Sequence, residues 1–405
     1  MQKEVYPNEE KTKPALMGLY CEQPFRNLEL HQDSKAYLCC PSWTYLDVGD
    51  FNKAPLSEIW NSTNAQKIRA SILDGTYSYC NKDLCPHISG NVLKKHFELE
   101  KEIRDYVSKN EQHLKHSPRN VMFSFDPSCN LSCPSCRSQK ISYQLNTSDL
   151  LNSKKLIEKI MSELFLNPLE NICLNITGSG DPFSGLAFRQ FLETIEGKHF
   201  PNLSFDFQTN GLLLTPRTWE NISKIHENIH AISISIDAAT EESYKKLRRG
   251  GDWTTLIENL KFLSQMRFEK KLFPFLRVNF VVQKSNYKEM TEFVKLFTSI
   301  KVDEIYFSQI ADWGSMSELE FQNEAIHLEH HKDHFHFLNV LADPLFHVVN
   351  LGNLTPLRKK ALVLYAQEKN IIKRMKVFAN YEVPLLPKKI KKFLFLIVRS
   401  KVKNN

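Results

Sequence analysis

The sequence feature that most constrains this chain is a group of three cysteines in the segment FSFDPSCNLSCPSCRSQK. Cys129, Cys133 and Cys136 are separated by three and then two residues. Thiolates are the standard ligands of iron–sulfur clusters, and three of them bind three irons of a four-iron cluster and leave one iron open. An open coordination position suits catalysis rather than structure alone. The spacing predicts a 4Fe–4S cluster here, with a zinc knuckle completed by a fourth, distant ligand as the alternative.

The residues that follow this group predict the fold. From Asn120 onward, short β-branched and aromatic runs alternate with amphipathic helical segments, which is typical of repeated βα units around a parallel sheet. The predicted strands are Val121–Phe125, Ile172–Thr177, Leu203–Gln208, Ala231–Ile236, Phe275–Val282 and Glu304–Ser308. The predicted helices are Ser153–Leu164, Gly185–Glu196, Pro216–Glu227, Glu241–Gln265 and Lys288–Ser299. Six strand–helix repeats favour an α/β fold with an open, partial (β/α)6 barrel over a closed eight-fold one.

We expect four regions along the 405 residues. Residues 1–90 form a small cysteine-rich domain with one helix near Leu56–Asp74, and residues 91–117 form a helical linker in which the charged stretch Val92–Ser108 is a solvated helix. Residues 118–315 form the partial barrel. Residues 316–405 form a helical extension that ends in a basic tail.

The cysteine loop and the βα repeats resemble the radical S-adenosylmethionine superfamily. The resemblance implies that S-adenosylmethionine chelates the open iron, that the cluster donates one electron, and that a 5′-deoxyadenosyl radical abstracts a hydrogen atom from a substrate. The chain departs from the family at Ser135, where an aromatic residue usually precedes the third cysteine and packs near the adenine.

The loops after the later strands also resemble the family's cofactor-binding loops. The segment TGSGDP resembles the Gly-Gly-Glu-Pro loop that contacts the methionyl amine, with Ser179 and Asp181 as departures. The resemblance implies that Arg248 or Arg249 pairs with the methionyl carboxylate; the sequence does not separate the two. The residues expected to border S-adenosylmethionine are Gly178, Ser179, Gly180, Asp181, Asn210, Ser235, Asp237, Arg248 and Asn279. No residue is assigned a direct catalytic role.

A second group of cysteines lies near the N-terminus and comprises Cys21, Cys39, Cys40, Cys80 and Cys85. Their arrangement resembles the SPASM and twitch modules that bind an auxiliary 4Fe–4S cluster, although here the module precedes the barrel. The resemblance implies Cys21, Cys39, Cys80 and Cys85 as ligands, with Cys40 as the substitute for Cys39. Four thiolates would close the site, which suits electron transfer or structure. A zinc ribbon on the same four cysteines is the alternative.

Composition and the chain ends constrain location and partners. The net charge of +7 is mild, so we expect no nucleic-acid partner. The first residues show no secretory signal and the apolar run Phe393–Val398 is too short to span a bilayer, so we expect a cytoplasmic protein. The resemblance implies a flavodoxin- or ferredoxin-type electron donor and a peptide, sugar or other small-molecule substrate. The tail KKIKKFLFLIVRSKVK could contact a membrane surface, but packing or disorder is equally compatible with it.

The C-terminal region also contains a histidine-rich stretch. His327, His330, His331, His334 and His336 are predicted on one helix, with the first, third and fourth on one face. A solvated helix is favoured over a metal site.

Two classes of function fit these patterns. The leading one is a radical enzyme that abstracts a hydrogen atom and passes an electron to its auxiliary cluster. The other is a non-catalytic, zinc-binding scaffold that recruits a partner.

Overall fold

The computed structural model describes residues 16–176 and 179–367, which divide into two compact units. The first unit contains the described residues up to Ser132, together with Gln139–Ser235 and Thr254–Leu276. The second contains Cys133–Ser138, Ile236–Trp253 and the described residues from Arg277 onward. The predicted first strand, the first helix and the cysteine loop up to Ser132 therefore belong to the first unit, which also includes the cysteine-rich N-terminal region, whereas Cys133 and Cys136 belong to the second unit.

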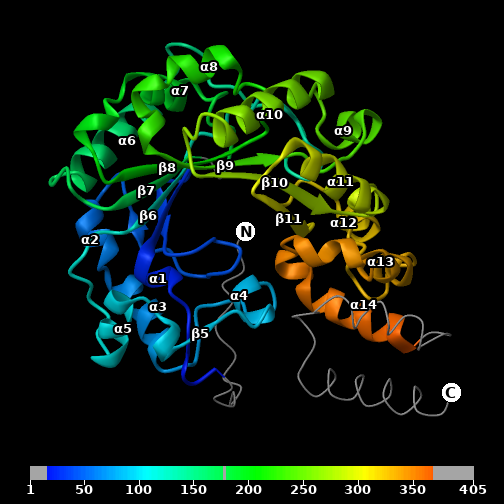
Figure 1. The fold of residues 1–405 in the computed structure, drawn as a ribbon. Coiled ribbons are helices and arrows are strands. Elements are labelled where there is room, and N and C mark those ends of the chain that lie inside the picture. Colours follow the sequence, from blue (N-terminus) through cyan, green and yellow to red (C-terminus); the bar gives the residue numbers. More distant parts are fainter. Residues whose placement is uncertain (1–15, 177–178, 368–405) are drawn as a thin grey trace. The chain divides into compact units, whose positions relative to one another are not determined.

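Parallel strands form the centre of the first unit. Strands β6 (Asn120–Ser124), β7 (Ile172–Ile176), β8 (Leu203–Thr209) and β9 (Ile229–Ser235) pair in that order, each parallel to the next. Residues such as Val121, Leu174 and Phe205 are fully or almost fully buried on one face of this sheet. Helices α6 (Ser148–Leu164) and α7 (Leu186–Thr194) lie along the outer side of these strands (Figure 1). The predicted α/β fold is confirmed, and the described residues form no closed barrel.

The N-terminal region adds a strand that the sequence analysis missed. Strand β2 (Asn27–His31) pairs in parallel with β6, so that His31 lies opposite Ser124. Strands β3 (Lys35–Tyr37) and β4 (Gly49–Asp50) continue the sheet antiparallel to β2. The N-terminal region is therefore not a separate appendage, because its first hairpin extends the parallel sheet.

The helices of the N-terminal region are held around a buried arginine. The predicted helix over Leu56–Asp74 is two helices, α2 (Leu56–Trp60) and α3 (Thr63–Leu73), because Ser62 caps the second one. Arg69 of α3 is fully buried and donates to the carbonyl oxygens of Pro24, Trp60 and Gln112 at 2.8 to 3.0 Å. Its guanidinium also lies over the Trp60 ring at 4.5 Å. Burial lowers the pKa of Arg69 to about 9.

The linker prediction was wrong in part. Only Lys101–Ser108 forms a helix, α5, and its Ile103 and Val107 are buried, so this helix is not solvated on every side. The other short elements of the first unit are β1 (Leu19–Tyr20), α1 (Gln23–Arg26), α4 (Pro86–Ser89), β5 (Lys94–Lys95), η1 (His96–Glu98) and η2 (Gly197–His199). Helix α8 (Pro216–Asn221) ends earlier than predicted and is followed by the 3-10 helix η3 (Ser223–Asn228).

The predicted helix Glu241–Gln265 is also two helices. Helix α9 (Glu241–Leu247) and helix α10 (Trp253–Phe268) are separated by Gly250 and Gly251. Gly250 has a φ of +91°, a conformation that residues with a Cβ rarely adopt and that cannot continue a helix. The break puts α9 in the second unit and most of α10 in the first.

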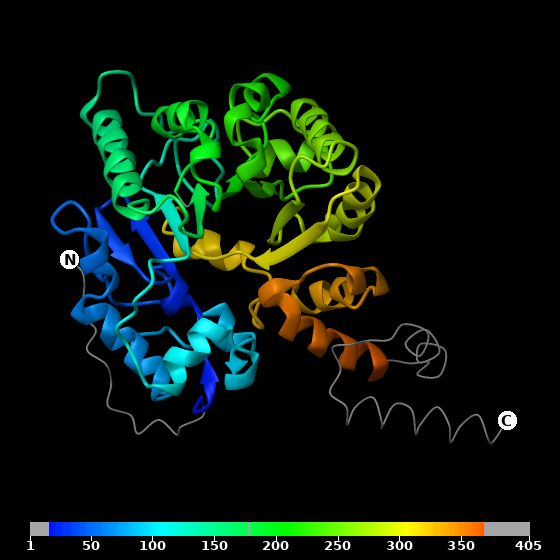
Figure 2. The ribbon, with the colours of Figure 1, turned by 60° about the vertical axis from the view of Figure 1, so that its left-hand side comes forward.

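The second unit contains the last two repeats and the C-terminal helices. Strand β10 (Phe275–Val282) has the predicted bounds and pairs in parallel with β11 (Glu304–Gln309), followed along the chain by helices α12 (Glu318–Glu324), α13 (His334–Leu341) and α14 (Thr355–Gln367). The helix between the strands is α11 (Met290–Ile300), after the 3-10 helix η4 (Tyr287–Glu289). The 3-10 helices η5 (Pro344–Val348) and η6 (Gly352–Leu354) lie between α13 and α14. Figures 1 and 2 show α14 alongside α13, where Arg358 donates to the carbonyl oxygen of Leu341 at 2.7 Å.

The prediction of one histidine-rich, solvated helix was wrong. Helix α13 begins only at His334, and both His331 and His334 are buried. His331 bonds the carbonyl oxygen of Asn323 at 2.9 Å and His334 bonds that of Ile326 at 3.0 Å. These side chains stabilise the turns between α12 and α13 instead of lining one face of a helix. The predicted basic tail lies outside the described residues, as do the first fifteen residues.

Candidate functional site

The loop after β6 places Cys129 at the carboxyl end of the parallel strands. Asp126 accepts a hydrogen bond from the Ser128 backbone N–H at 2.9 Å, which tightens the turn. The Cys129 N–H donates to the Ile141 carbonyl oxygen at 2.8 Å. Two further donors lie near its Sγ: the Leu131 N–H at 3.4 Å and the Asn210 Nδ2 at 3.9 Å. Donors around a cysteine sulfur stabilise the thiolate and tune a cluster bound to it.

Asp181 links the loops that follow three strands. Its carboxylate is buried and accepts from the Thr209 hydroxyl at 2.7 Å, the Asn210 N–H at 2.8 Å and the Phe183 N–H at 3.1 Å. Its own N–H donates to the Ser128 carbonyl oxygen at 2.8 Å. Burial raises the pKa of Asp181, and the bonds from Asn210 and Thr209 oppose that rise. The bonds from Thr209 and Asn210 hold the start of the loop after β8, while the third bond, from Phe183, lies within the loop after β7 that contains Asp181 itself.

Gly180 and Ser179 pack against the same loop. A Cβ on Gly180 would lie 2.5 Å from the carbonyl oxygens of both Asp126 and Ser128, so only glycine fits there. The Ser179 hydroxyl donates to the Ser124 carbonyl oxygen at 2.8 Å. These contacts bring the predicted TGSGDP loop against the cysteine loop. Gly178 lies outside the described residues.

In the second unit, Arg248 lies beside Cys133. Its guanidinium pairs with the Asp237 carboxylate at 2.6 Å and lies 3.8 Å from the Cys133 Sγ. Burial raises the pKa of the Cys133 thiol, and the positive charge of Arg248 lowers it. Arg249 is exposed and donates to the carbonyl oxygen of Ser138 at 3.5 Å. Of the two arginines left open by the sequence, Arg248 is the one that lies beside a cysteine of the trio.

Among the buried polar atoms of the second unit that lack a hydrogen-bond partner within the described residues are Arg248 Nε, Asn279 Oδ1 and Tyr244 Oη. A buried polar atom is costly unless it is satisfied, so orphaned atoms of this kind suit a polar ligand. Asn279 was predicted to face the adenosyl group, whereas Tyr244 was not singled out. Ser235 ends β9 in the first unit and is half-buried.

The turn between Cys133 and Cys136 is local. The N–H groups of Cys136 and Arg137 both donate to the Cys133 carbonyl oxygen at 2.9 Å. Cys133 is buried and Cys136 is exposed. Within the part of the chain that the structure describes, no group of three or more His, Cys, Asp or Glu side chains lies in a metal-binding arrangement, so ligation by the three cysteines stays a prediction.

The N-terminal cysteines are all free thiols and they interact with one another. Burial first, and then the charges of Cys80 and Cys85, raise the pKa of Cys21 to about 12. Burial followed by the charges of Glu29, Cys21 and Cys85 raises the pKa of Cys39 well above its usual value. The four predicted ligands are therefore close enough to affect each other electrostatically.

This donor set fits an iron–sulfur cluster chemically. Burial and then the charge of Cys85 raise the pKa of Cys80 to about 12, so without a metal this thiol keeps its proton at neutral pH. A cluster binds thiolates and supplies the positive charge that such a buried group lacks. Burial and the charges of Glu29 and Cys85 also raise the pKa of Cys40. Cys39 and Cys40 therefore remain alternatives for the same ligand position.

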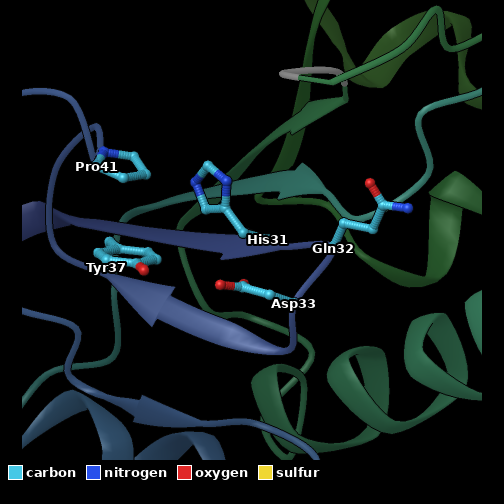
Figure 3. Close-up of a pocket in the computed structure, with 5 residues that line it drawn as sticks. All are labelled: His31, Gln32, Asp33, Tyr37 and Pro41. Atoms are coloured by element: carbon cyan, nitrogen blue, oxygen red, sulfur yellow. The ribbon is translucent and has the colours of Figure 1, made fainter. Parts of the chain in front are cut away.

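One group of polar side chains was missed by the sequence analysis because β2 was not predicted. Glu29 and His31 project from one face of β2, while Leu28 and Leu30 are fully buried on the other. His31, with Gln32, Asp33, Tyr37 and Pro41, lines an open groove of about 460 Å³ (Figure 3). The alternation in NLELH was the available signal.

No helix among residues 16–176 and 179–367 has the length and apolar character needed to cross a bilayer.

Comparison with known proteins agrees with this arrangement. Residues 123–297 match the model of the Radical SAM superfamily, and residues 21–137 match that of an iron–sulfur cluster-binding domain, SPASM. The first model implies a 4Fe–4S cluster and S-adenosylmethionine, and the second supports an auxiliary cluster.

Individual relatives are distant. The chain is 26% identical over 202 residues to a probable GTP 3′,8-cyclase of Saccharolobus islandicus, in a match that covers 48% of this chain and 57% of the relative. The chain thus spans little more than half the length of that relative. Streptococcus suis SuiB bound to S-adenosylmethionine matches with 18% identity and a TM-score of 0.36, over 54% of this chain and 45% of SuiB. Native anSMEcpe with bound AdoMet matches with 20% identity and a TM-score of 0.34, over 48% of this chain and 52% of that chain.

Proposed function

The chain is a radical S-adenosylmethionine protein with an N-terminal SPASM-like iron–sulfur domain, and we propose that it cleaves S-adenosylmethionine reductively to a 5′-deoxyadenosyl radical. The radical abstracts a hydrogen atom from a peptide, sugar or other small-molecule substrate. A low-potential flavodoxin- or ferredoxin-type protein supplies the electron. The four regions 1–90, 91–117, 118–315 and 316–405 are part of this proposal as functional divisions of the chain.

The observation that carries this proposal is the environment of the cysteine loop. Cys129 has an amide donor, Asn210, and Cys133 has a guanidinium, Arg248, within 4 Å of its sulfur. A cluster held by Cys129, Cys133 and Cys136 would have one iron free for the amine and carboxylate of S-adenosylmethionine. When bound, the cluster would supply the electron that reduces the sulfonium of S-adenosylmethionine.

The chain's own residues position these groups. Asp181 holds the Asn210 backbone, and Gly180 lets the β7 loop approach the backbone of Asp126 and Ser128. In the second unit Arg248 carries a positive charge suited to the methionyl carboxylate, and the orphaned Asn279 Oδ1 is an acceptor suited to the ligand's donors. Buried, fixed groups of this kind bind a ligand without reorganisation.

The proposal treats the N-terminal cysteines as the ligands of a second 4Fe–4S cluster that assists electron transfer. Four thiolates leave this cluster no open iron, so it is suited to electron transfer rather than to binding S-adenosylmethionine.

The proposal is tested by anaerobic reconstitution of the full chain with iron and sulfide. We expect about eight irons per chain, a broad absorbance near ~400 nm, and formation of 5′-deoxyadenosine and methionine when dithionite and S-adenosylmethionine are added. Protein that instead retains zinc, gains no such absorbance and forms no 5′-deoxyadenosine would support the zinc-binding scaffold and refute the enzyme.

A further inference from the structure

The groove beside His31 is built on the hairpin of β2 and β3. Tyr37 lies directly opposite Glu29 across the hairpin, and the rings of Tyr37 and His31 meet edge to face with centroids 5.3 Å apart. Figure 3 shows the His31 ring, the Tyr37 ring and Pro41 around one hollow, with the Asp33 carboxylate directed toward Tyr37. Two aromatic rings, a proline and a carboxylate thus face the same space.

His31 is held in one orientation by a buried acid. Its Nε2 lies 3.2 Å from Oε2 of Glu29, which is only 9% exposed. A neutral histidine that donates from Nε2 to a carboxylate carries its lone pair on Nδ1. In that neutral form, the remaining ring nitrogen of His31 is a hydrogen-bond acceptor.

The charge of the groove is negative. The described residues that line it include Asp33 but no lysine or arginine. Acceptors, a carboxylate and an aromatic face together suit an organic cation. They do not suit the triphosphate of a nucleotide, which needs basic partners.

Within the first unit, the groove also lies close to the loop that contains Cys129 and to the N-terminal cysteines Cys39 and Cys40. His31 is paired with Ser124 at the carboxyl end of β6, which is the strand that leads into Cys129. Gln32 donates to the Tyr143 hydroxyl at 3.0 Å, and the Tyr143 N–H donates to the hydroxyl of Ser128, the neighbour of Cys129. On the other side, Pro41 directly follows Cys40, and Glu29 acts electrostatically on both Cys39 and Cys40.

We propose that this groove binds a primary ammonium group of the substrate, which His31 Nδ1, the Asp33 carboxylate and the Tyr37 ring contact directly. Glu29 is a positioning residue, because it acts through His31. The inference rests on the proposed function, since it takes the ligand to be the substrate of the radical reaction. It narrows the substrate to an amine, such as a peptide with a lysine side chain or an amino sugar.

The test uses the reconstituted full chain labelled with 15N-histidine and kept oxidised, so that no S-adenosylmethionine is cleaved. Lysinamide is the probe, and the His31→Gln variant assigns the His31 ring signals. We expect lysinamide to shift these signals saturably at millimolar concentrations, and Asp33→Asn to weaken its binding at least fivefold. The matched control Glu220→Gln removes an exposed acid from α8 and should change the affinity by less than twofold.

The positioning role of Glu29 has its own readout. In the wild type the 15N shifts of His31 should report a proton on Nε2, and Glu29→Gln should abolish that preference even if the fold is intact. GTP should leave the His31 signals unchanged. The inference is overturned if lysinamide causes no saturable shift, if Asp33→Asn and Glu220→Gln bind it equally, or if GTP occupies the groove instead. Because no reductant is present, these outcomes are independent of whether the protein cleaves S-adenosylmethionine.

Discussion

The two groups of cysteines have different surroundings. In the N-terminal group, burial first and then the charges of Glu29, Cys21 and Cys85 raise the pKa of Cys39. In the loop group, Cys129 has the amide of Asn210, and Cys133 has the guanidinium of Arg248, which itself pairs with Asp237. Side-chain donors thus lie within 4 Å of two sulfurs of the loop group, while the charges that act on Cys39 are those of an acid and of other thiols.

This difference separates a closed site from an open one. Thiols that neighbour mainly one another can saturate a metal cluster and leave no room for a further ligand. Cys129 beside an amide in the first unit, and Cys133 beside a guanidinium in the second, leave polar groups available for a ligand that carries a carboxylate and an amine. We therefore expect substitutions in the two groups to have different effects.

The largest difference is expected between two cysteine substitutions. Cys133→Ala should lower 5′-deoxyadenosine formation at least 100-fold, because S-adenosylmethionine loses the cluster that reduces it. Cys85→Ala should retain most of this cleavage. Each variant should lose about four irons per chain, measured alongside 5′-deoxyadenosine by chromatography. Equal loss of cleavage in both variants would mean that the two sites are not functionally distinct.

The charge beside the loop group gives the next largest effect. Arg248→Met should lower the rate of S-adenosylmethionine cleavage by about 10- to 100-fold, because the methionyl carboxylate loses its ion pair. Arg249→Met is the matched control, since Arg249 is exposed and lies beside the same turn. Its cleavage rate should stay within about twofold of the wild type; the reverse order of effects would assign the carboxylate to Arg249.

The stability of the N-terminal region should depend on Arg69. Arg69→Met leaves the carbonyl oxygens of Pro24, Trp60 and Gln112 without their donor and should lower the free energy of unfolding by about 3 kcal/mol. Urea denaturation of the metal-free protein measures this loss, and the exposed Arg217→Met serves as the control. A loss below about 1 kcal/mol would show that the buried guanidinium does not organise this region.

The smallest expected effect concerns the metal-free thiols. The pKa of Cys21 and Cys80 is raised to about 12 by burial first, from an ordinary value of 9.0. A group whose pKa is raised on folding contributes stability that is full below its unfolded pKa and is lost as the pH rises through its folded pKa. The metal-free protein should therefore become less stable between pH 9 and 12.

Alkylation of the same metal-free protein at pH 8 should give the reactivity of each of these thiols separately. Iodoacetamide should label Cys21 and Cys80 at least tenfold more slowly than Cys136, which is exposed. Peptide mass spectrometry measures the rates. Equal labelling rates would contradict the buried, mutually interacting arrangement of the N-terminal thiols.

Much of the fold could be predicted because its strands are short runs rich in β-branched and aromatic residues, as in β8 and β10. Each of the six predicted strands of the repeats is found within two residues of its expected bounds, and β10 matches at both ends. Local periodicity fixes such elements. The pairing of β2 with β6 joins segments about ninety residues apart, and no local pattern reports a pairing of that kind.

The errors have equally specific causes. The histidine spacing from His327 to His334 was compatible with a helix, but His331 and His334 bond backbone carbonyl oxygens and hold a turn instead. Asp181 was expected to face a ligand, and the sequence could not show that Thr209, Asn210 and Phe183 would occupy its carboxylate. The groove at His31 was missed because its residues come together only when β2 joins the sheet.

The open iron is tested most directly by electron paramagnetic resonance of the reconstituted, dithionite-reduced protein, recorded before and after S-adenosylmethionine is added. We expect two overlapping cluster signals. One should shift when S-adenosylmethionine is added and should be absent from Cys133→Ala, while the other should be unchanged. If neither signal responds to S-adenosylmethionine, or if the responding signal survives in Cys133→Ala, the cysteine loop does not hold a cluster with a vacant iron.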